Sequence, residues 1–368
     1  KDVYELCGHS ALRVKHSNGL DYVVNYGLFD FDSPNFLYRF VSGQTDYKAG
    51  AQPTEYFLAA YNRHGRSVTE YTLNLTGPQK ERLDSLLREN VLPENCTYRY
   101  NYVKDNCATR PLCMIERAIG DSITFMKEPA DIAGWTFRDE MTWFHRNYPW
   151  YQFGIDLALG SGIDYPLTIR EKGFAPLMLD SLLREAYIPD STGSLQPLVT
   201  GFDTVIPGAE GGVAAGPTPW YLTPAAVFWA LFALVLAVSI RDIIKRTDSK
   251  WLDTILFGTY GLAGCVIMFL IFCSEHEATS PNWLAVGLNP LCFIGAIFPW
   301  IPNFNKLLYY YHTANFIVLF IMICAWPFTG QAFNMAFWPL LLMDMLRSDT
   351  YRMIWKCKKA NTYTVRQK

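Results

Sequence analysis

The long apolar segments of this 368-residue chain are concentrated between residues 220 and 346. They cover residues 220–240, 252–274, 283–300, 307–327 and 333–346. The first has no charged side chain, and the second has only Asp253. A helix needs about 20 mostly apolar residues to cross a bilayer, so the pattern predicts an α-helical membrane domain of about five spans. The fifth segment is short for a span, and a tilted or half-buried segment is the alternative there.

The preceding part of the chain, up to residue 219, has shorter patterns typical of strands and helices. Two strands, at 10–14 and 22–26, flank Asn18-Gly19, a strong hairpin signal. Further strands are predicted at 69–75 and 98–102, and helices at 78–90, 107–119, 136–146 and 176–186. Residues 189–219 are rich in Gly, Pro, Ser and Thr and indicate a linker or a long loop.

These patterns divide the chain into four parts. We expect an α+β domain at 1–125, an extension and linker at 126–219, membrane helices at 220–346 and a basic tail at 347–368. Loop 241–251 and the tail are rich in Lys and Arg, whereas loops 275–282 and 329–332 contain neither. The positive-inside rule therefore predicts a cytoplasmic tail and an exported head. An exported head requires a signal peptide, and none is visible, so it has been cleaved or the sequence given omits it.

Charge and cysteine content narrow the function classes. Residues 1–219 contain 20 basic and 27 acidic side chains, which is a poor match for nucleic acid. Four of the nine cysteines lie in this head, and their spacing does not resemble a zinc site, so no metal and no cofactor is expected. An exported domain can pair some of its cysteines, and the pattern among Cys7, Cys96 and Cys113 stays open.

Cys107 and His9 are the residues that suggest catalysis. Cys107 follows Asp105-Asn106, two good helix-capping residues, at the predicted start of a helix. A helix N-terminus stabilises a thiolate, and an imidazole can take the proton of the thiol. His9 begins a strand after Gly8, whereas His16 and His64 lie in polar turns. If the fold brings Cys107 and His9 together, the protein is a covalent thiol enzyme. The alternative is that Cys107 is a small buried side chain.

Five sequence motifs carry a family resemblance. They are Gly-His-Ser-Ala at 8–11, Asn-Tyr-Gly-Leu-Phe-Asp-Phe at 25–31, Asn-Tyr-Val-Lys-Asp-Asn-Cys-Ala-Thr-Arg at 101–110, Phe-Gly-Ile-Asp-Leu-Ala-Leu-Gly at 153–160, and Glu-His-Glu-Ala-Thr-Ser-Pro-Asn at 275–282 ahead of Leu-Asn-Pro-Leu at 288–291. With these motifs the chain resembles the Lnb family of bacterial lipoprotein N-acyltransferases. The order of histidine strand and cysteine helix also resembles the permuted papain-like fold of lecithin:retinol acyltransferase and its relatives.

The resemblance implies a function. An acyl chain would pass from a phospholipid, through a thioester on Cys107, to the N-terminal amine of a diacylglyceryl-cysteine lipoprotein. His9 would act as general base and acid, and the N–H of Cys107 would help to stabilise the oxyanion. The partners would be the donor phospholipid, the diacylated lipoprotein and membrane lipids. The protein would be a multi-pass protein of the bacterial inner membrane with its catalytic head in the periplasm.

The residue that orients His9 depends on the hairpin register. A two-residue Asn18-Gly19 turn pairs Leu12 with Asn25 and leaves Tyr26 as the candidate. A three-residue loop, with Gly19 in the left-handed conformation, pairs Ala11 with Asn25 and places Asn25 on the same face as His9. We favour the second register, since Asn25 also matches the family pattern.

Four further residues are candidates for substrate binding. Arg110 lies one turn beyond Cys107 and would bind a lipid phosphate, although a salt bridge on the helix surface is equally compatible with its position. Glu275, His276 and Asn282 lie at the predicted outer mouth of two spans and would contact a lipid headgroup or the lipoprotein. The alternative interpretation is that these three residues lie in a solvated loop without a binding role.

Two other function classes remain open. A Cys–His amidase or peptidase that cuts peptidoglycan would use the same two catalytic residues. A receptor with a degenerate site is the third class. A wall hydrolase needs only one membrane anchor, whereas five spans can form a lateral entrance for acyl chains, so the acyltransferase is favoured.

Overall fold

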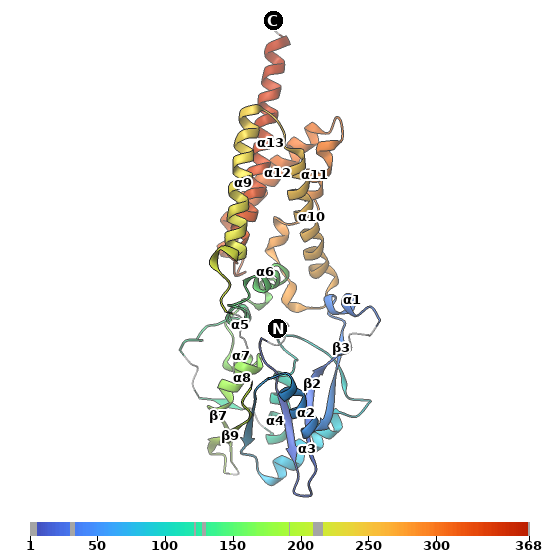
Figure 1. Cartoon of the computed structure of the whole chain (residues 1–368), viewed down its shortest axis with the longest axis vertical. Helices are drawn as coiled ribbons and strands as arrows, with labels where there is room; N and C mark the ends of the chain where they lie inside the picture. Colours follow the sequence, from blue (N-terminus) through green and yellow to red (C-terminus); the bar gives the residue numbers. More distant parts are fainter. Residues whose placement is uncertain are drawn as a thin grey trace. The chain divides into compact units, whose positions relative to one another are not determined.

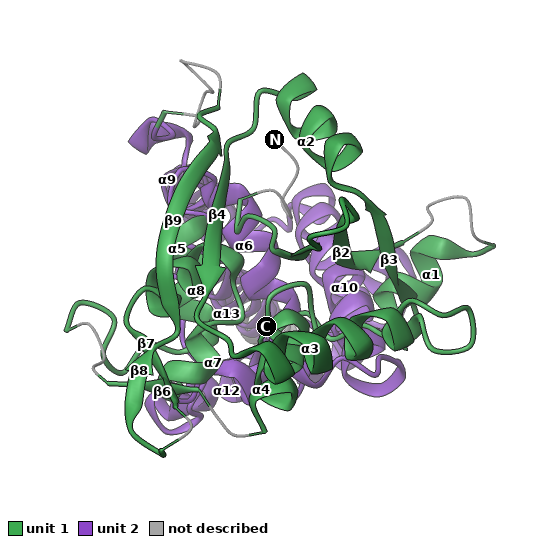
Figure 2. Ribbon diagram, turned by 90° about the horizontal axis from the view of Figure 1, so that it is seen from below, with its two compact units in different colours: residues 1–144, 166–216 green, residues 145–165, 217–368 purple. Residues whose placement is uncertain are grey.

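The computed structural model describes residues 6–29, 34–120, 123–126, 130–190, 192–208 and 216–366, with side chains described to residue 359. Asp30 and Phe31 of the 25–31 motif and Lys368 of the basic tail lie outside these residues. The chain forms two compact units (Figure 2). Unit 1 comprises Lys1–Phe144 and Pro166–Gly216, and unit 2 comprises His145–Tyr165 and Pro217–Lys368.

Unit 1 is built on a four-stranded antiparallel sheet with the order β1-β2-β3-β5. Its strands are β1 (Ala11–Lys15), β2 (Asp21–Leu28), β3 (Asp46–Pro53) and β5 (Thr97–Arg99). The hairpin prediction is confirmed, because Gly19 has φ +92° and the pairing runs from Ala11↔Asn25 to Lys15↔Asp21. Strand β3 was not predicted from the sequence, because only Tyr47 among its residues has a high strand propensity and the segment also contains Gly50 and Pro53.

Two helices cover this sheet and complete the core of unit 1. They are α3 (Gly77–Asn90) and α4 (Thr109–Ile119) (Figure 1). Thr76 and Gln79 form a capping box at the start of α3, and Gly120 ends α4 in the left-handed conformation, as the sequence pattern indicates. Val24 and Tyr26 of the sheet share one buried cluster with Leu87 of α3 and Leu112 of α4.

Two smaller sheets complete the strands of unit 1. Strand β4 (Val68–Leu73) pairs with β9 (Val199–Ile206), and β6 (Thr124–Phe125), β7 (Ala186–Pro189) and β8 (Leu195–Pro197) form the other sheet. The prediction of linker or loop from residue 189 is therefore wrong for β8 and β9. Most of β9 is exposed, so its sequence lacks the apolar alternation of a half-buried strand. The remaining helices are α1 (Phe36–Val41), α2 (Thr54–Arg63), α5 (Phe137–Phe144), α7 (Ile169–Lys172) and α8 (Pro176–Leu183).

Unit 2 is helical. Its elements are α6 (Pro149–Ala158), α9 (Pro224–Lys245), α10 (Lys250–Cys273), α11 (Cys292–Ile297), α12 (Asn305–Ala325) and α13 (Phe337–Arg366). Within the described residues, three helical segments are long and apolar enough to cross a membrane: Pro224–Lys245, Lys250–Cys273 and Asn305–Phe328. The prediction of five such helices is not confirmed.

The other two predicted spans differ from regular apolar helices for local reasons. Residues 283–300 are broken into short helical turns around α11, in a stretch that contains Pro290 and Pro299. This segment runs antiparallel along α10, because Asn289 lies against Gly264 and Trp300 against Thr254. Residues 333–346 are only the beginning of the much longer α13, which carries several charged side chains.

A buried ion-pair cluster joins three helices of unit 2. Arg347 of α13 makes two hydrogen bonds to Asp253 of α10, at 2.6 and 3.0 Å. It also contacts Asp242 and Ser239 of α9, each at 3.1 Å. All four side chains are buried. Charged groups inside a membrane bundle are stable only when they are paired, so this cluster fixes α9, α10 and α13 to one another.

Candidate active site

Asn106 shapes the turn that carries Cys107. Its side-chain oxygen accepts hydrogen bonds from the N–H groups of Ala108 (2.8 Å) and Thr109 (3.0 Å). Its amide nitrogen donates to the carbonyl oxygens of Tyr102 (2.7 Å) and Phe174 (2.9 Å). The prediction that α4 begins at Cys107 is therefore wrong by two residues. The amide of Asn106 holds Cys107, which is half-buried, in the turn that leads into the helix.

His9 and Asn25 form a side-chain pair in the same unit. Nε2 of His9 lies 3.1 Å from Oδ1 of Asn25. The pair depends on the second of the two registers, which the structure has, with Ala11 opposite Asn25. Tyr26, the alternative partner, faces the core, where its hydroxyl donates to Asn90. Because Oδ1 can only accept, Nε2 of His9 carries the hydrogen, and Nδ1 is the basic nitrogen of the neutral ring.

The residues next to this pair contact Cys107. The hydroxyl of Ser10 donates to the carbonyl oxygen of Cys107 at 2.7 Å. The backbone N–H groups of Ser10 and Cys107 both face the Cys107 sulfur. Gly27 lies beside the same residue, since a Cβ at position 27 would be 3.7 Å from the Cβ of Cys107. The start of β1, the end of β2 and the turn before α4 therefore meet at Cys107.

Gly8 gives the chain its conformation just before His9. Its φ is +81°, which is strained for a residue with a side chain. A Cβ at this position would also lie 2.9 Å from Cγ of Leu177. Both the backbone conformation and the close approach of Leu177 therefore require glycine beside the candidate base.

Burial favours the neutral form of both candidate catalytic groups. It raises the pKa of the Cys107 thiol to about 11, although the N–H groups of Ser10 and Cys107 act to lower it. Burial lowers the pKa of His9; the hydrogen bond to Asn25 opposes that shift, and the charge of Arg66 adds to it. At neutral pH the site therefore holds a thiol and a neutral imidazole. Such a pair reacts when the imidazole removes the thiol proton during attack on a carbonyl.

Arg110 braces the Cys107 turn by an ion pair. Its guanidinium makes two hydrogen bonds to Asp105, at 2.5 and 2.8 Å, and lies 3.4 Å from the ring centroid of Tyr98. Asp105 and Arg110 stand on either side of Cys107 in sequence, so their ion pair closes the turn. The structure therefore has the salt bridge that the sequence left open as the alternative to phosphate binding by Arg110.

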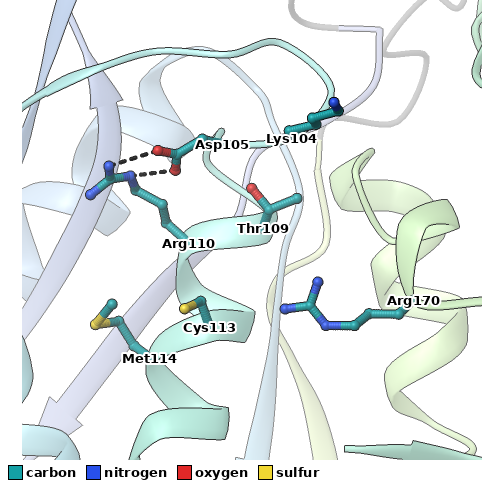
Figure 3. A pocket seen from close by; sticks show the side chains of 7 residues that line it. All are labelled: Lys104, Asp105, Thr109, Arg110, Cys113, Met114 and Arg170. Atoms are coloured by element: carbon teal, nitrogen blue, oxygen red, sulfur yellow. Dashed lines mark hydrogen bonds and ion pairs between the residues drawn. The ribbon is translucent and has the colours of Figure 1, made fainter. Parts of the chain in front are cut away.

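A pocket of about 390 Å³ lies along the first turns of α4. It is lined by Lys104, Asp105, Thr109, Arg110, Cys113, Met114 and Arg170. In Figure 3 the Arg110 side chain turns toward Asp105, while the Arg170 side chain extends toward Cys113. Arg170 is held by two hydrogen bonds to Glu116, at 2.6 and 2.9 Å. Both guanidinium groups at this pocket are thus neutralised by carboxylates.

The other predicted binding residues belong to unit 2. Asn282 is buried: its oxygen accepts from the N–H of Leu284, and its nitrogen donates to the carbonyl oxygen of Leu157. It thereby holds α6 against the spans and differs from the expected solvent-facing contact. Glu275 is exposed and His276 is half-buried, at the end of α10.

The described cysteines form no disulfide, and two residues at the site were not predicted from the sequence. All nine cysteines lie in described segments, and each is a free thiol, so Cys7, Cys96 and Cys113 form no disulfide. Ser10 and Gly27 were not predicted as site residues. Both lie inside the motifs that suggested the family, and that was the only signal that pointed to them.

Two family models match the chain, one in the N-terminal part and one in the C-terminal part. Residues 1–136 match the family model described as the Lnb N-terminal periplasmic domain. Residues 217–360 match the one described as the Lnb transmembrane domain. No curated protein and no solved structure matches the chain. The first match contains His9, Asn25 and Cys107, and it identifies the N-terminal part as the periplasmic part of a membrane protein.

Proposed function

Since the chain belongs to the Lnb family, we propose that it is a lipoprotein N-acyltransferase that works through a thioester on Cys107. The observation that supports this most is the arrangement at Cys107. Asn25 orients His9, and Ser10, the next residue, binds the carbonyl oxygen of Cys107. A thiol, an oriented base and nearby N–H donors are what acyl transfer through a covalent intermediate requires.

The first half-reaction acylates the enzyme. Nδ1 of His9 takes the thiol proton while the sulfur of Cys107 attacks an ester carbonyl of a phospholipid. The N–H groups of Ser10 and Cys107, which face the sulfur, would donate hydrogen bonds to the oxyanion. Collapse of the tetrahedral intermediate breaks the ester bond. The departing alkoxide of the lysophospholipid receives the proton from His9.

The second half-reaction transfers the acyl chain to the acceptor. The free N-terminal amine of a diacylglyceryl-cysteine lipoprotein attacks the thioester, and His9 accepts a proton from it. The amide forms, the carbon–sulfur bond breaks, and His9 returns the proton to the thiolate. The cycle needs neither an oxidant nor a cofactor. The high pKa of the Cys107 thiol favours return to the protonated resting state.

Asn25 and Arg110 serve this reaction by position. The acceptor oxygen of Asn25 keeps the hydrogen on Nε2, so Nδ1 is the basic nitrogen that would take the thiol proton. The Asp105–Arg110 ion pair holds the Cys107 turn. Glu275 and His276 remain proposed contacts for a headgroup or the lipoprotein at the end of α10.

The membrane arrangement is part of the same proposal. Besides the three long helices, the segment 283–300 and α13 each run along the bundle, as their contacts with α10 and α12 indicate. We propose five crossings of the bacterial inner membrane, with the basic residues after position 346 in the cytoplasm. An outer-leaflet phospholipid and a membrane-anchored lipoprotein would then share the membrane with the enzyme. A permuted papain-like head agrees with the order of β1, β2 and the Cys107 turn.

The test is intact-mass analysis of the purified full-length protein after incubation with phospholipid vesicles. We expect the mass to increase by one acyl group, and neutral hydroxylamine to remove the adduct. The C107A variant should gain no adduct, whereas C113S, which changes another free thiol on α4, should gain it as wild type does. Lipoprotein acylation by C107A would overturn the thioester mechanism. Hydrolysis of peptidoglycan peptides, without acyl transfer, would indicate the amidase.

A further inference from the structure

Helix α1 presents large apolar side chains to its surroundings. Leu37 is 73 % exposed, Tyr38 57 % and Phe40 47 %. Leu37 is the most exposed large apolar residue in the described part of unit 1. Since single exposed apolar residues are ordinary, the relevant observation is that these three belong to one six-residue helix without a buried residue.

A row of aromatic rings connects α1 with the candidate active site. The ring centroids of Phe40 and Phe36 are 5.9 Å apart, and those of Phe36 and Phe29 are 5.8 Å apart. Phe29 packs on Tyr47 at 5.1 Å, and Tyr47 stacks on Tyr100 at 4.1 Å. A Cβ at Gly27 would lie 3.5 Å from the Tyr100 ring and 3.7 Å from the Cβ of Cys107. A continuous series of ring contacts therefore connects α1 with Tyr100, which lies beside Gly27.

The charge on α1 is neutralised, which favours contact with the interface of a bilayer. Arg39 lies between Tyr38 and Phe40 and binds Asp46 at 3.1 Å and the carbonyl oxygen of Gln44 at 3.1 Å. The first turn of the helix has no acidic residue. Tyrosine and arginine beside exposed leucine and phenylalanine are typical of segments that lie in the interfacial region of a bilayer.

Unit 1 cannot move far from the bilayer, because the chain passes between the two units after residues 144, 165 and 216. The last of these connections leads from Gly216 to the start of α9 at Pro224. A link of this length spans at most about 30 Å when fully extended. Unit 1 is therefore tethered to the membrane helices by a short link.

We propose that α1 is a membrane-contacting helix, with Leu37, Tyr38 and Phe40 in the interfacial region of the periplasmic leaflet of the membrane that the same chain spans. This contact does not depend on the reaction that Cys107 performs. One consequence rests on the proposed function: the exposed end of the aromatic row would give an acyl chain an apolar surface along its path from the bilayer toward Cys107. Burial of apolar groups along such a path avoids their exposure to water.

Lipid photocrosslinking of the full-length protein in phosphatidylethanolamine–phosphatidylglycerol vesicles tests the proposal. Benzoylphenylalanine is placed at Leu37 in the C107A background, where no thioester can form, and lipid adducts are measured by mass spectrometry. Tyr56 of α2 (63 % exposed) and Phe202 of β9 (56 % exposed) are matched control positions. We expect at least about tenfold more lipid adduct at position 37 than at either control.

Two outcomes would overturn the proposal: equal labelling at all three positions, or no labelling at position 37. The thermal unfolding midpoint of each variant shows whether it is folded, and benzoylphenylalanine at Tyr38 replaces the Leu37 variant if that one is not. The labelling is measured without turnover. If the acyltransferase proposal failed, the crosslinking result would still stand. If the crosslinking result contradicted membrane contact, the acyltransferase proposal would still stand.

Discussion

Nε2 of His9 lies 3.1 Å from Oδ1 of Asn25, and the two residues meet because Ala11, two positions after His9, pairs with Asn25 across the β1–β2 hairpin. In an antiparallel ladder a slip of one residue would move Asn25 to the opposite face. The three-residue turn ending in Gly19 therefore decides which residue can orient the imidazole. Three of the following predictions concern this site.

The pH dependence of kcat/KM should report His9. Burial lowers the pKa of His9 from 6.5, and only the neutral ring can accept a proton, so activity should fall on the acidic side at a pH below 6.5. The Asn25 hydrogen bond raises this pKa, so N25L should move the acid limb to still lower pH. It should also reduce the plateau, because the ring is no longer oriented. An acid limb above 6.5 in wild type would contradict the assignment.

H9A should lose about 10²- to 10⁴-fold in kcat/KM, the usual contribution of a general base. H16A is the matched control, because His16 lies at the far end of the same hairpin, where it contacts Asp84. Its activity should stay near that of wild type. Full activity of H9A would move the role of base to another histidine.

G8A should be strained in two ways. The left-handed backbone costs about 1–3 kcal/mol for a non-glycine residue, and the new Cβ would meet Leu177 at 2.9 Å. We expect a lower free energy of unfolding and a reduced kcat. G77A is the control, since no atom lies within 4 Å of a Cβ there. The double variant G8A/L177A should recover only part of the loss, because the backbone strain remains. Full recovery would mean that φ at residue 8 does not matter.

R347L should destabilise unit 2 by about 3–5 kcal/mol, because it leaves the buried carboxylates of Asp242 and Asp253 without their cation. Unfolding of the detergent-solubilised protein measures the effect. K358A removes an ion pair between Lys358 and Asp248 that is largely exposed and should cost less than about 1 kcal/mol. Equal stability of the two variants would show that the buried cluster does not hold the helices.

Reporter fusions should count the membrane crossings. A fusion at residue 208 should be periplasmic, and one at 359 cytoplasmic. The informative position is Asn303, between the segment 283–300 and α12. If residues 283–300 cross the bilayer, a reporter at 303 is cytoplasmic, which is the result we expect. A periplasmic reporter at 303 together with a cytoplasmic one at 359 would leave only the three long helices as spans.

Features that depend on local patterns could be predicted from the sequence. The long apolar runs predicted α9, α10 and α12, because a bilayer imposes both length and composition on a helix. Asn18-Gly19 indicated the hairpin, and the helices predicted at 78–90 and 107–119 lie within two residues of α3 and α4. The motifs that contain His9, Asn25 and Cys107 were also recognised from the sequence alone.

Features that depend on contacts between residues far apart in the chain became clear with the three-dimensional structure. It selected the hairpin register and brought Ser10 onto the carbonyl oxygen of Cys107. In the structure β9 also pairs with β4, which lies more than a hundred residues earlier in the chain. Asn282 is buried and donates a hydrogen bond to the carbonyl oxygen of Leu157. A solvent-exposed strand, a buried amide and a broken membrane segment have no periodic signal of their own. Their conformation is set by hydrogen-bond partners and packing that the local sequence does not contain.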